Sequence, residues 1–165
     1  MLGYVGLGSN LGDREAHLRA GLLAMAKGGV RPVAVSSLWE TAPVDGAGPG
    51  WFLNMAARVD TGLSPEEVLA VLLAAERERG RRRGRPNAPR ELDLDLLLLG
   101  DFERSSPELT LPHPRMGSRR FVLAPLSELA PEYEAALAAL DDRHEARRIG
   151  KLALPETLPV YSRAL

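Results

Sequence analysis

An alternation of leucine with acidic residues constrains the fold of this chain more than any other feature of its sequence. Residues 91–96 are Glu-Leu-Asp-Leu-Asp-Leu, and a period of two predicts a β-strand that is buried on one face. The leucines would then face the core, whereas Asp93 and Asp95 would share the opposite face with their Cα atoms about 6.5–7 Å apart. The chain therefore requires a sheet whose second face accommodates two neighbouring carboxylates.

The two aspartates and the arginines before them favour a site for metal and phosphate. Two carboxylates this close repel each other unless a cation lies between them, and Mg²⁺ prefers oxygen ligands completed by phosphates and water. Arginine suits phosphate because it offers a planar fork of donors. The arginines in question are Arg77, Arg79, Arg81, Arg82, Arg83, Arg85 and Arg90. The pattern suggests metal-assisted chemistry on a polyphosphate. The same residue pattern also fits a polar strand face and an arginine-rich loop that are simply exposed to solvent.

Length and composition narrow the class of protein. A chain of 165 residues fits one domain over residues 1–165, in which the tail beyond about residue 131 has no clear assignment. The net charge of −1 gives no overall attraction to nucleic acid or membrane, and the absence of cysteine excludes disulfides and thiolate metal sites. The first residues lack the features of a signal peptide, and no apolar run approaches the ~20 residues that span a bilayer. We expect a cytoplasmic, monomeric protein.

Local patterns predict the element order β-α-β-β-α-β. Strands are expected over residues 2–7, 33–41, 52–61 and 91–96. Helices are expected after Asp13, a plausible N-cap, and after Ser64, which begins a capping box with Glu67. This order is typical of a ferredoxin-like α+β sandwich, an antiparallel sheet with helices on one face and, here, the ligand site on the other side. Phe52, Asn54 and both aspartates would lie on that free face.

Later segments carry weaker signals. We expect a short strand at 109–111, a helix capped by Ser118 that Pro125 ends or kinks, a helix from Pro131 to about residue 140, and a last strand at 158–161. Glycine-rich residues 6–12 fit a tight strand-to-helix turn, because their spacing matches neither a dinucleotide-binding motif nor a P-loop.

An ordered set of segments resembles the 6-hydroxymethyl-7,8-dihydropterin pyrophosphokinase family of folate biosynthesis. The segments, in family order and close to family spacing, are Tyr4–Gly12, Ser36–Thr41, Phe52–Asn54, Gly80–Arg83, Pro89–Asp95, Leu111–Met116 and Arg119–Leu126. Two positions depart from the family pattern: Asn87-Ala88 stands where many members have Trp-Gly, and Ala42 replaces a common proline. The departures touch neither the aspartates nor the aromatic residues discussed next.

The resemblance implies transfer of diphosphate from ATP to the hydroxymethyl group of a reduced pterin, with release of AMP. It implies that Asp93 and Asp95 hold two Mg²⁺ ions and act in catalysis together with Arg81, Arg83 and Arg90. The residues matching the family's ATP contacts are Glu76, Arg81, Arg83, Arg90, Leu96, Thr110, His113 and Arg119. The residues matching its pterin contacts are Thr41, Val44, Phe52, Asn54 and Phe121, in which the two phenylalanines would sandwich the ring.

Two other functions fit parts of the sequence. A palm-type nucleotidyltransferase also sets two aspartates on a ferredoxin-like sheet, but it has no need of Phe52 and Phe121 around Asn54. An RNA-binding module could use residues 77–90 as a basic patch, but the carboxylates beside that patch would repel a phosphate backbone. We therefore expect ATP and a reduced pterin as partners, and neither nucleic acid nor membrane.

Overall fold

The computed structural model describes residues 1–43, 50–80, 90–140, 145–152 and 154 of the chain. Its strands are β1 (Leu2–Ser9), β2 (Val30–Val35), β3 (Ser37–Thr41), β4 (Phe52–Thr61), β5 (Asp93–Leu99), β6 (Arg104–Ser105), β7 (Thr110–Leu111) and β8 (Ala146–Lys151). Its helices are α1 (Arg14–Lys27), α2 (Pro65–Glu78), α3 (Arg120–Leu129) and α4 (Glu134–Ala138), with short 3-10 turns at Met116–Ser118 and Pro131–Tyr133.

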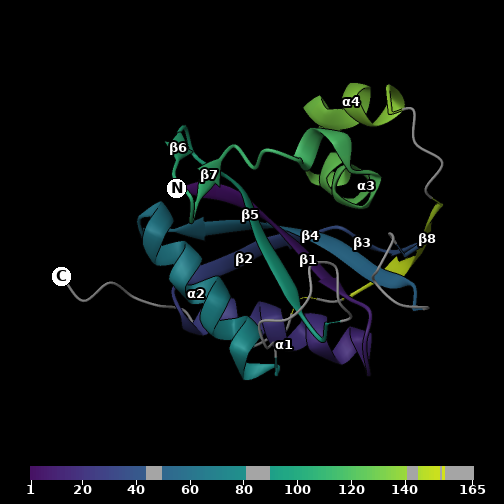
Figure 1. The fold of residues 1–165 in the computed structure, drawn as a ribbon, viewed down its shortest axis with the longest axis horizontal. Coiled ribbons are helices and arrows are strands. Elements are labelled where there is room, and N and C mark those ends of the chain that lie inside the picture. Colours follow the sequence, from purple (N-terminus) through teal and green to yellow (C-terminus); the bar gives the residue numbers. More distant parts are fainter. Residues whose placement is uncertain (44–49, 81–89, 141–144, 153, 155–165) are drawn as a thin grey trace.

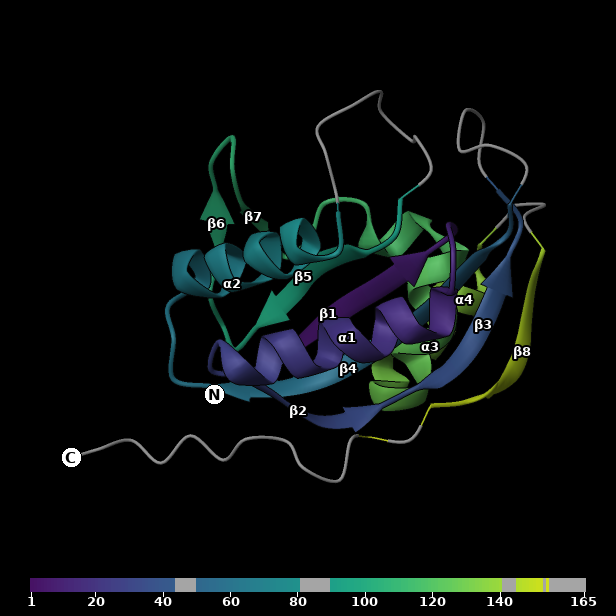
Figure 2. The same cartoon turned by 90° about the horizontal axis from the view of Figure 1, so that it is seen from below.

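Six strands form one antiparallel sheet (Figure 1). The strand order is β5-β1-β4-β3-β8, and β2 pairs with β4 beyond the end of β3. Helices α1 and α2 lie together under one face of this sheet (Figure 2), while β6 and β7 form a separate hairpin. The expected α+β sandwich is therefore confirmed, with β5 beside β1 as the ferredoxin-like order requires.

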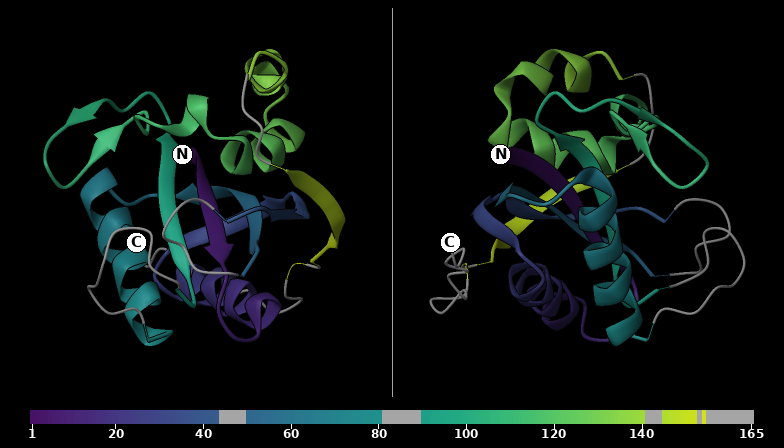
Figure 3. Two further views of the ribbon diagram at one scale, coloured as in Figure 1. Left: turned by 45° about the vertical axis from the view of Figure 1, so that its right-hand side comes forward. Right: turned by 90° about the vertical axis from the view of Figure 1, so that its left-hand side faces the viewer.

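The opposite face of the sheet is covered in part, because α3 lies on it and α4 packs against α3 (Figure 3). Ala56 of β4 and Leu97 of β5 are buried there against Leu123 and Leu126 of α3. The sequence pattern predicts helices on one face alone and leaves this face wholly to the ligand site. Apolar side chains at these strand positions instead require a partner, because burial removes their surface from water.

The main core lies between the sheet and the helices α1 and α2. The alternating leucines of residues 92–96 face it as predicted, together with Leu53, Met55, Ala57 and Val59 of β4 and Leu18, Leu22 and Met25 of α1. Leu97 continues the alternation, since it lies on the face of the two aspartates and packs in the second core. The alternation breaks after it, because the register of β5 against β1 shifts by one residue there, so that Leu98 also packs against the second core and Leu99 lies in the main core. The shift leaves the two aspartates unaffected on the face opposite the main core.

Local capping signals are confirmed at both long helices. The Asp13 side chain accepts a hydrogen bond from the backbone N–H of Ala16 at 3.1 Å, and Ser64 forms the full capping box with Glu67. Gly80 follows α2 with a φ of +88°, a left-handed conformation that favours glycine. These ends depend on residues three or four positions apart, so the sequence alone specifies them.

Several expected elements differ from those observed. Residues 33–41 belong to two strands, which separate at Ser36, where the backbone N–H turns to Ala56 O at 2.9 Å. Ser118 does not cap α3, since its hydroxyl donates to Arg115 O at 3.2 Å. The same helix continues through Pro125 to Leu129.

The C-terminal region departs most from expectation. The helix expected from Pro131 to about residue 140 is a 3-10 turn followed by α4, which ends at Ala138. Strand β8 was not expected at all, because its sequence Ala-Arg-Arg-Ile-Gly-Lys has no apolar alternation. The strand expected at 158–161 lies outside the described residues.

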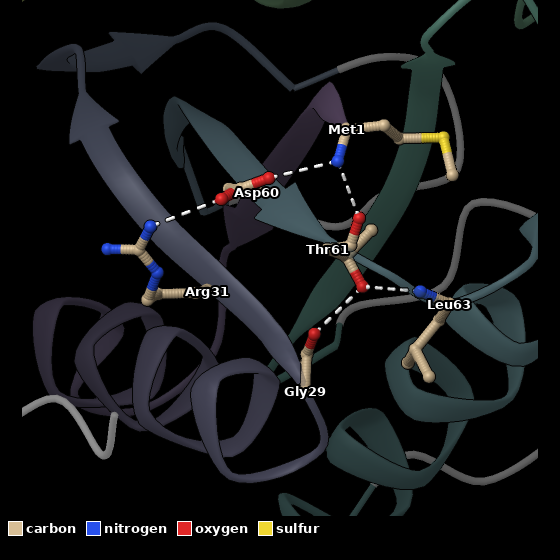
Figure 4. Close-up of polar contacts among 6 residues, drawn as sticks. All are labelled: Met1, Gly29, Arg31, Asp60, Thr61 and Leu63. Carbon is tan, nitrogen blue, oxygen red and sulfur yellow. Dashed lines mark hydrogen bonds and ion pairs between the residues drawn. The ribbon is translucent and has the colours of Figure 1, made fainter. Parts of the chain in front are cut away.

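Polar contacts fasten the end of the sheet that lies away from the aspartates (Figure 4). The amino group of Met1 donates to Asp60 at 3.0 Å and to Thr61 O at 2.7 Å, and Arg31 pairs with the same aspartate at 3.2 Å. The Thr61 hydroxyl donates to Gly29 O at 2.8 Å, which ties β4 to the end of α1.

Within the described part of the chain, every helix is too short or too polar to cross a bilayer.

Candidate active site

One row of residues crosses the open part of the sheet from β5 to β4. Asp93 lies opposite Gly8 of β1, and Gly8 lies opposite Asn54 of β4. Because neighbouring strands are about 4.8 Å apart, the Cα atoms of Asp93 and Asn54 are about 10 Å apart. Asp95 follows on the same face opposite Gly6. Because Gly6 and Gly8 have no side chains, β1 itself adds none between the carboxylates and Asn54.

Asp93, the first residue of β5, lies beside the positively charged side chain of Arg90. Arg90 pairs with it at 3.1 Å, and both side chains are half-buried. Asn10 holds the backbone of Arg90 at both polar groups: its Oδ1 accepts the Arg90 N–H at 2.9 Å, and its own N–H donates to Arg90 O at 3.2 Å. The turn after β1 therefore sets the position of the arginine, which in turn meets Asp93.

His113 and Arg119 add donors beside the aspartates. The backbone N–H of His113 donates to Leu97 O at 2.9 Å, which fastens this loop to β5. The pKa of His113 is lowered, first by burial and then by the positive charges of Arg119 and Arg115. The negative charge of Asp93 raises this pKa, but by less. The His113 Nδ1 accepts from the backbone N–H of Arg115 at 3.2 Å. The imidazole is therefore neutral at pH 7, with its proton on Nε2.

Burial and the charge of Arg115 also lower the pKa of Arg119, whereas Asp95 and Asp93 raise it. A guanidinium stays protonated at neutral pH all the same. Its Cζ lies 5.3 Å from the centre of the Phe121 ring, a cation–π contact. Arg119 thus lies between the carboxylates of β5 and the first turn of α3.

A buried polar pair and an aromatic ring mark the β3–β4 side of the site. Asn54 and Thr41 are 5% and 4% exposed, and the Asn54 Nδ2 donates to the Thr41 Oγ1 at 2.7 Å. Phe52, which pairs with Thr41 across the strands, is half-buried and lies near Gly8. Phe121 is also half-buried on this face, where it packs against the second core.

Glu76 and Leu96, which match ATP contacts of the family, have their side chains on the side of the sheet that faces the main core. Glu76 is 3% exposed, and its Oε1 accepts the Leu94 N–H at 2.8 Å. Leu94 lies between the two aspartates on the outer edge strand, so this contact fixes β5. Leu96 is 4% exposed within the main core, so its side chain does not face the aspartates. Thr110 is half-buried on β7.

The remaining predicted residues, Val44, Arg81 and Arg83, lie outside the described residues. Sequence reasoning missed Asn10, Arg115 and the open floor at Gly6 and Gly8. A signal for the glycines was present, since both stand at alternate positions of a strand. The role of these glycines depends on which strands pair with β1 on either side, and no local sequence pattern specifies that pairing.

The donor set at β5 fits magnesium. Two half-buried carboxylates share one face, and both offer hard oxygen ligands. No group of three or more His, Cys, Asp or Glu side chains suited to a metal occurs among the described residues. A cation here would take its other ligands from phosphate and water, which is the usual arrangement for Mg²⁺.

Comparison with known proteins gives concordant results over most of the chain. Residues 4–131 match the family 7,8-dihydro-6-hydroxymethylpterin-pyrophosphokinase (HPPK). The 2-amino-4-hydroxy-6-hydroxymethyldihydropteridine pyrophosphokinase of Bacillus subtilis (strain 168) is 39% identical over 151 residues, which are 91% of this chain and 90% of that protein. The mitochondrial folate synthesis bifunctional protein of Arabidopsis thaliana is 46% identical over 125 residues, 76% of this chain but 23% of that longer protein.

A solved structure supports the fold. It is described as an HPPK-DHPS in complex with substrates, and it superposes with a TM-score of 0.65 over 84% of this chain and 43% of that chain. Sequence identity in the superposition is 11%, so this similarity concerns the fold alone. Since the family match covers more than half of the chain and a relative of similar length is 39% identical, the chain belongs to the 7,8-dihydro-6-hydroxymethylpterin-pyrophosphokinase family.

Proposed function

We propose that the open face of the sheet performs the reaction of this family, with phosphates over β5 and pterin over β4. The reaction transfers diphosphate from ATP to the hydroxymethyl group of 6-hydroxymethyl-7,8-dihydropterin in folate biosynthesis. The pterin hydroxyl oxygen bonds to the β-phosphorus, the bond between that phosphorus and the α,β-bridging oxygen breaks, AMP leaves with the bridging oxygen, and the hydroxyl proton passes to solvent. The row Asp93–Gly8–Asn54 carries the proposal, because it sets the Cα atoms of Asp93 and Asn54 about 10 Å apart on one face with only a glycine between them.

Asp93 and Asp95 would hold magnesium in this proposal, and two ions are expected. Bound Mg²⁺ supplies charge neutralisation for the phosphates and for the AMP leaving group. The carboxylates supply the oxygen ligands, and their backbone is fixed by β1 on one side and by Glu76 through Leu94 on the other. We therefore assign Glu76 to positioning the aspartates, in addition to its predicted place near the nucleotide.

The cationic side chains around β5 would orient the triphosphate. Arg90 and Arg119 lie beside the aspartates, and a guanidinium offers paired donors to phosphate oxygens. His113 presents a neutral Nε2–H, which can donate to an anion without adding charge. Phosphoryl transfer depends chiefly on such positioning and on electrostatic stabilisation. Arg81 and Arg83 would add further phosphate contacts.

Asn54 and Thr41 would bind the polar edge of the pterin, because they form the buried hydrogen-bonding pair on this face. Phe52 and Phe121 would stack on the ring, an arrangement worth about 0.5–1.5 kcal/mol for each aromatic beyond burial. Val44 would contribute its backbone. Thr110 and the main chain near Leu96 would border the adenosine at the other side of β5.

A direct assay tests this function. The protein is mixed with ATP, MgCl₂ and 6-hydroxymethyl-7,8-dihydropterin, and AMP is quantified by chromatography. We expect one AMP for each pterin diphosphate, and no AMP when EDTA is present or the pterin is omitted. ADP as the nucleotide product, or AMP release that does not depend on the pterin, would contradict the proposal.

A further inference from the structure

Arg14, the first residue of α1, joins the two chain segments that lead into the pterin side of the site. Its Nη1 donates to the backbone oxygen of Trp51 at 2.9 Å. Its Nη2 donates to the Glu40 Oε1 at 2.8 Å. Glu40 precedes the end of β3, and Trp51 immediately precedes β4. One guanidinium therefore holds the end of one strand against the start of the next.

The other oxygen of Glu40 is held from β8. Arg147 donates to the Glu40 Oε2 from Nη2 at 2.6 Å and from Nε at 3.1 Å. The Cζ of Arg147 also lies 5.0 Å from the centre of the Trp51 ring. Hydrogen bonds from Arg14, and then from Arg147, hold the pKa of Glu40 below its ordinary value, so the carboxylate stays ionised between both cations.

These contacts act on the face of the sheet opposite the pterin residues. Leu53, which pairs with Glu40 across β3 and β4, faces the main core. Thr41 and Phe52, the next pair along, point to the other face because strand side chains alternate. The ion pairs therefore reach the pterin residues only through the backbone, by fixing the residue directly before each one.

The sequence of strand β8 does not by itself favour a β-strand, because it offers little apolar surface to bury. Five of its six residues are exposed, and its sequence lies beyond residues 4–131, which the family match covers. It nevertheless pairs with β3 along Ser37–Thr41, with Arg147 opposite Glu40 and Ala146 opposite Thr41. Figure 2 shows it running alongside β3 at this edge of the sheet.

We propose that Arg14, Glu40 and Arg147 form a clamp that positions Thr41 and Phe52 for the pterin, so that β8 is a working part of the site. This inference rests on the pterin assignment made under the proposed function. The three residues are positioning residues, because none of them faces the ligand side of the sheet. The clamp sets pterin affinity and leaves the nucleotide side, which belongs to β5, unchanged.

The test compares Arg147→Ala and Glu40→Gln with Arg148→Ala as matched control. Arg148 is the next residue of β8 and lies over Trp39 at 5.8 Å, away from the carboxylate. Pterin affinity is measured by titration with Mg²⁺ and a non-hydrolysable ATP analogue present. We expect about tenfold weaker pterin binding in the two clamp variants, in line with the loss of charge-assisted hydrogen bonds. The control should stay within about twofold, as a surface substitution does.

Four further measurements separate positioning from mere stabilisation: ATP affinity, kcat, pterin affinity of a charge-retaining variant, and melting temperature. ATP affinity and kcat at saturating pterin should stay within about twofold in all variants, and Arg147→Lys, which retains the charge, should recover part of the lost pterin affinity. Variants that melt earlier but bind the pterin normally well below their melting temperature would overturn the clamp while leaving the proposed function intact. Wild-type protein that releases no AMP would instead overturn the proposed function, and the clamp with it.

Discussion

The substitution Gly8→Ala should disturb the pterin side of the site through a single atom. A Cβ built on Gly8 would lie 2.7 Å from the Asn54 Oδ1, and 3.8 Å from the nearest atom of Phe52. The first distance is too short to persist, so the amide has to move. Asn54 cannot move freely, because its Nδ2 is bonded to the buried Thr41 hydroxyl at 2.7 Å.

The expected magnitude follows from that hydrogen bond. When a buried polar group loses its partner, the free energy lost is about 1–3 kcal/mol. Applied to an amide that should bind the polar edge of the pterin, this range corresponds to roughly 5- to 150-fold weaker pterin binding. ATP binding should hardly change, because the nucleotide contacts belong to the β5 side.

Gly6→Ala provides the matched control on the same strand and face. Its Cβ would meet side-chain atoms of Leu97 at 3.7–4.0 Å, an ordinary contact, and alanine restricts the unfolded chain more than glycine does. Calorimetry with pterin and an ATP analogue gives both affinities, and denaturant unfolding gives stability. Normal pterin affinity in Gly8→Ala would refute the reasoning. An equal loss in Gly6→Ala would show that any side chain on this floor interferes.

Three other outcomes are expected. Alanine at Asp93 or at Asp95 should lower kcat by about 10²–10³ or more. The melting temperature should change little, because the loss of mutual repulsion between like charges offsets, at Asp93, the loss of its partly exposed ion pair with Arg90. AMP release close to wild type at saturating Mg²⁺ would show that the two aspartates do not hold the metal. Phe121→Ala should weaken pterin binding roughly 2- to 12-fold through lost stacking and spare ATP binding, whereas equal losses for both ligands would make this ring structural. Glu40 has a folded pKa below its unfolded value of about 4.5, so its stabilisation is present above that pH and is lost as the pH falls through the folded pKa. Denaturant unfolding should therefore show a shallower loss of stability from about pH 5 to pH 3 in Glu40→Gln than in wild type, and parallel curves would contradict the ion pairs.

Some features of this protein follow from sequence patterns of short range. The alternation at residues 91–96 was enough to place Asp93 and Asp95 on one face, because strand side chains alternate regardless of what pairs beside them. The caps at Asp13 and Ser64 were equally accessible, since each joins a side chain to a backbone N–H three residues away. The ordered family segments added the expected reaction and the expected site residues.

Patterns of short range failed where another segment decided the outcome. Residues 33–41 look like one strand, yet they divide because both halves must pair with the same β4. Pro125 looks like a helix terminator, yet α3 continues past it in contact with the second core. Strand β8 has no amphipathic pattern, and its extended conformation comes with pairing to β3.

The sequence by itself therefore determined which side chains could carry the chemistry, and the tertiary structure decided how far apart they stand and what supports them. Strand register places Gly8 between Asp93 and Asn54, and packing of α2 turns Glu76 toward the backbone of β5. Glu40 meets Arg14 at a separation of 26 residues and Arg147 at 107. Contacts over such separations depend on the register and packing of whole elements, which no local period of a sequence encodes.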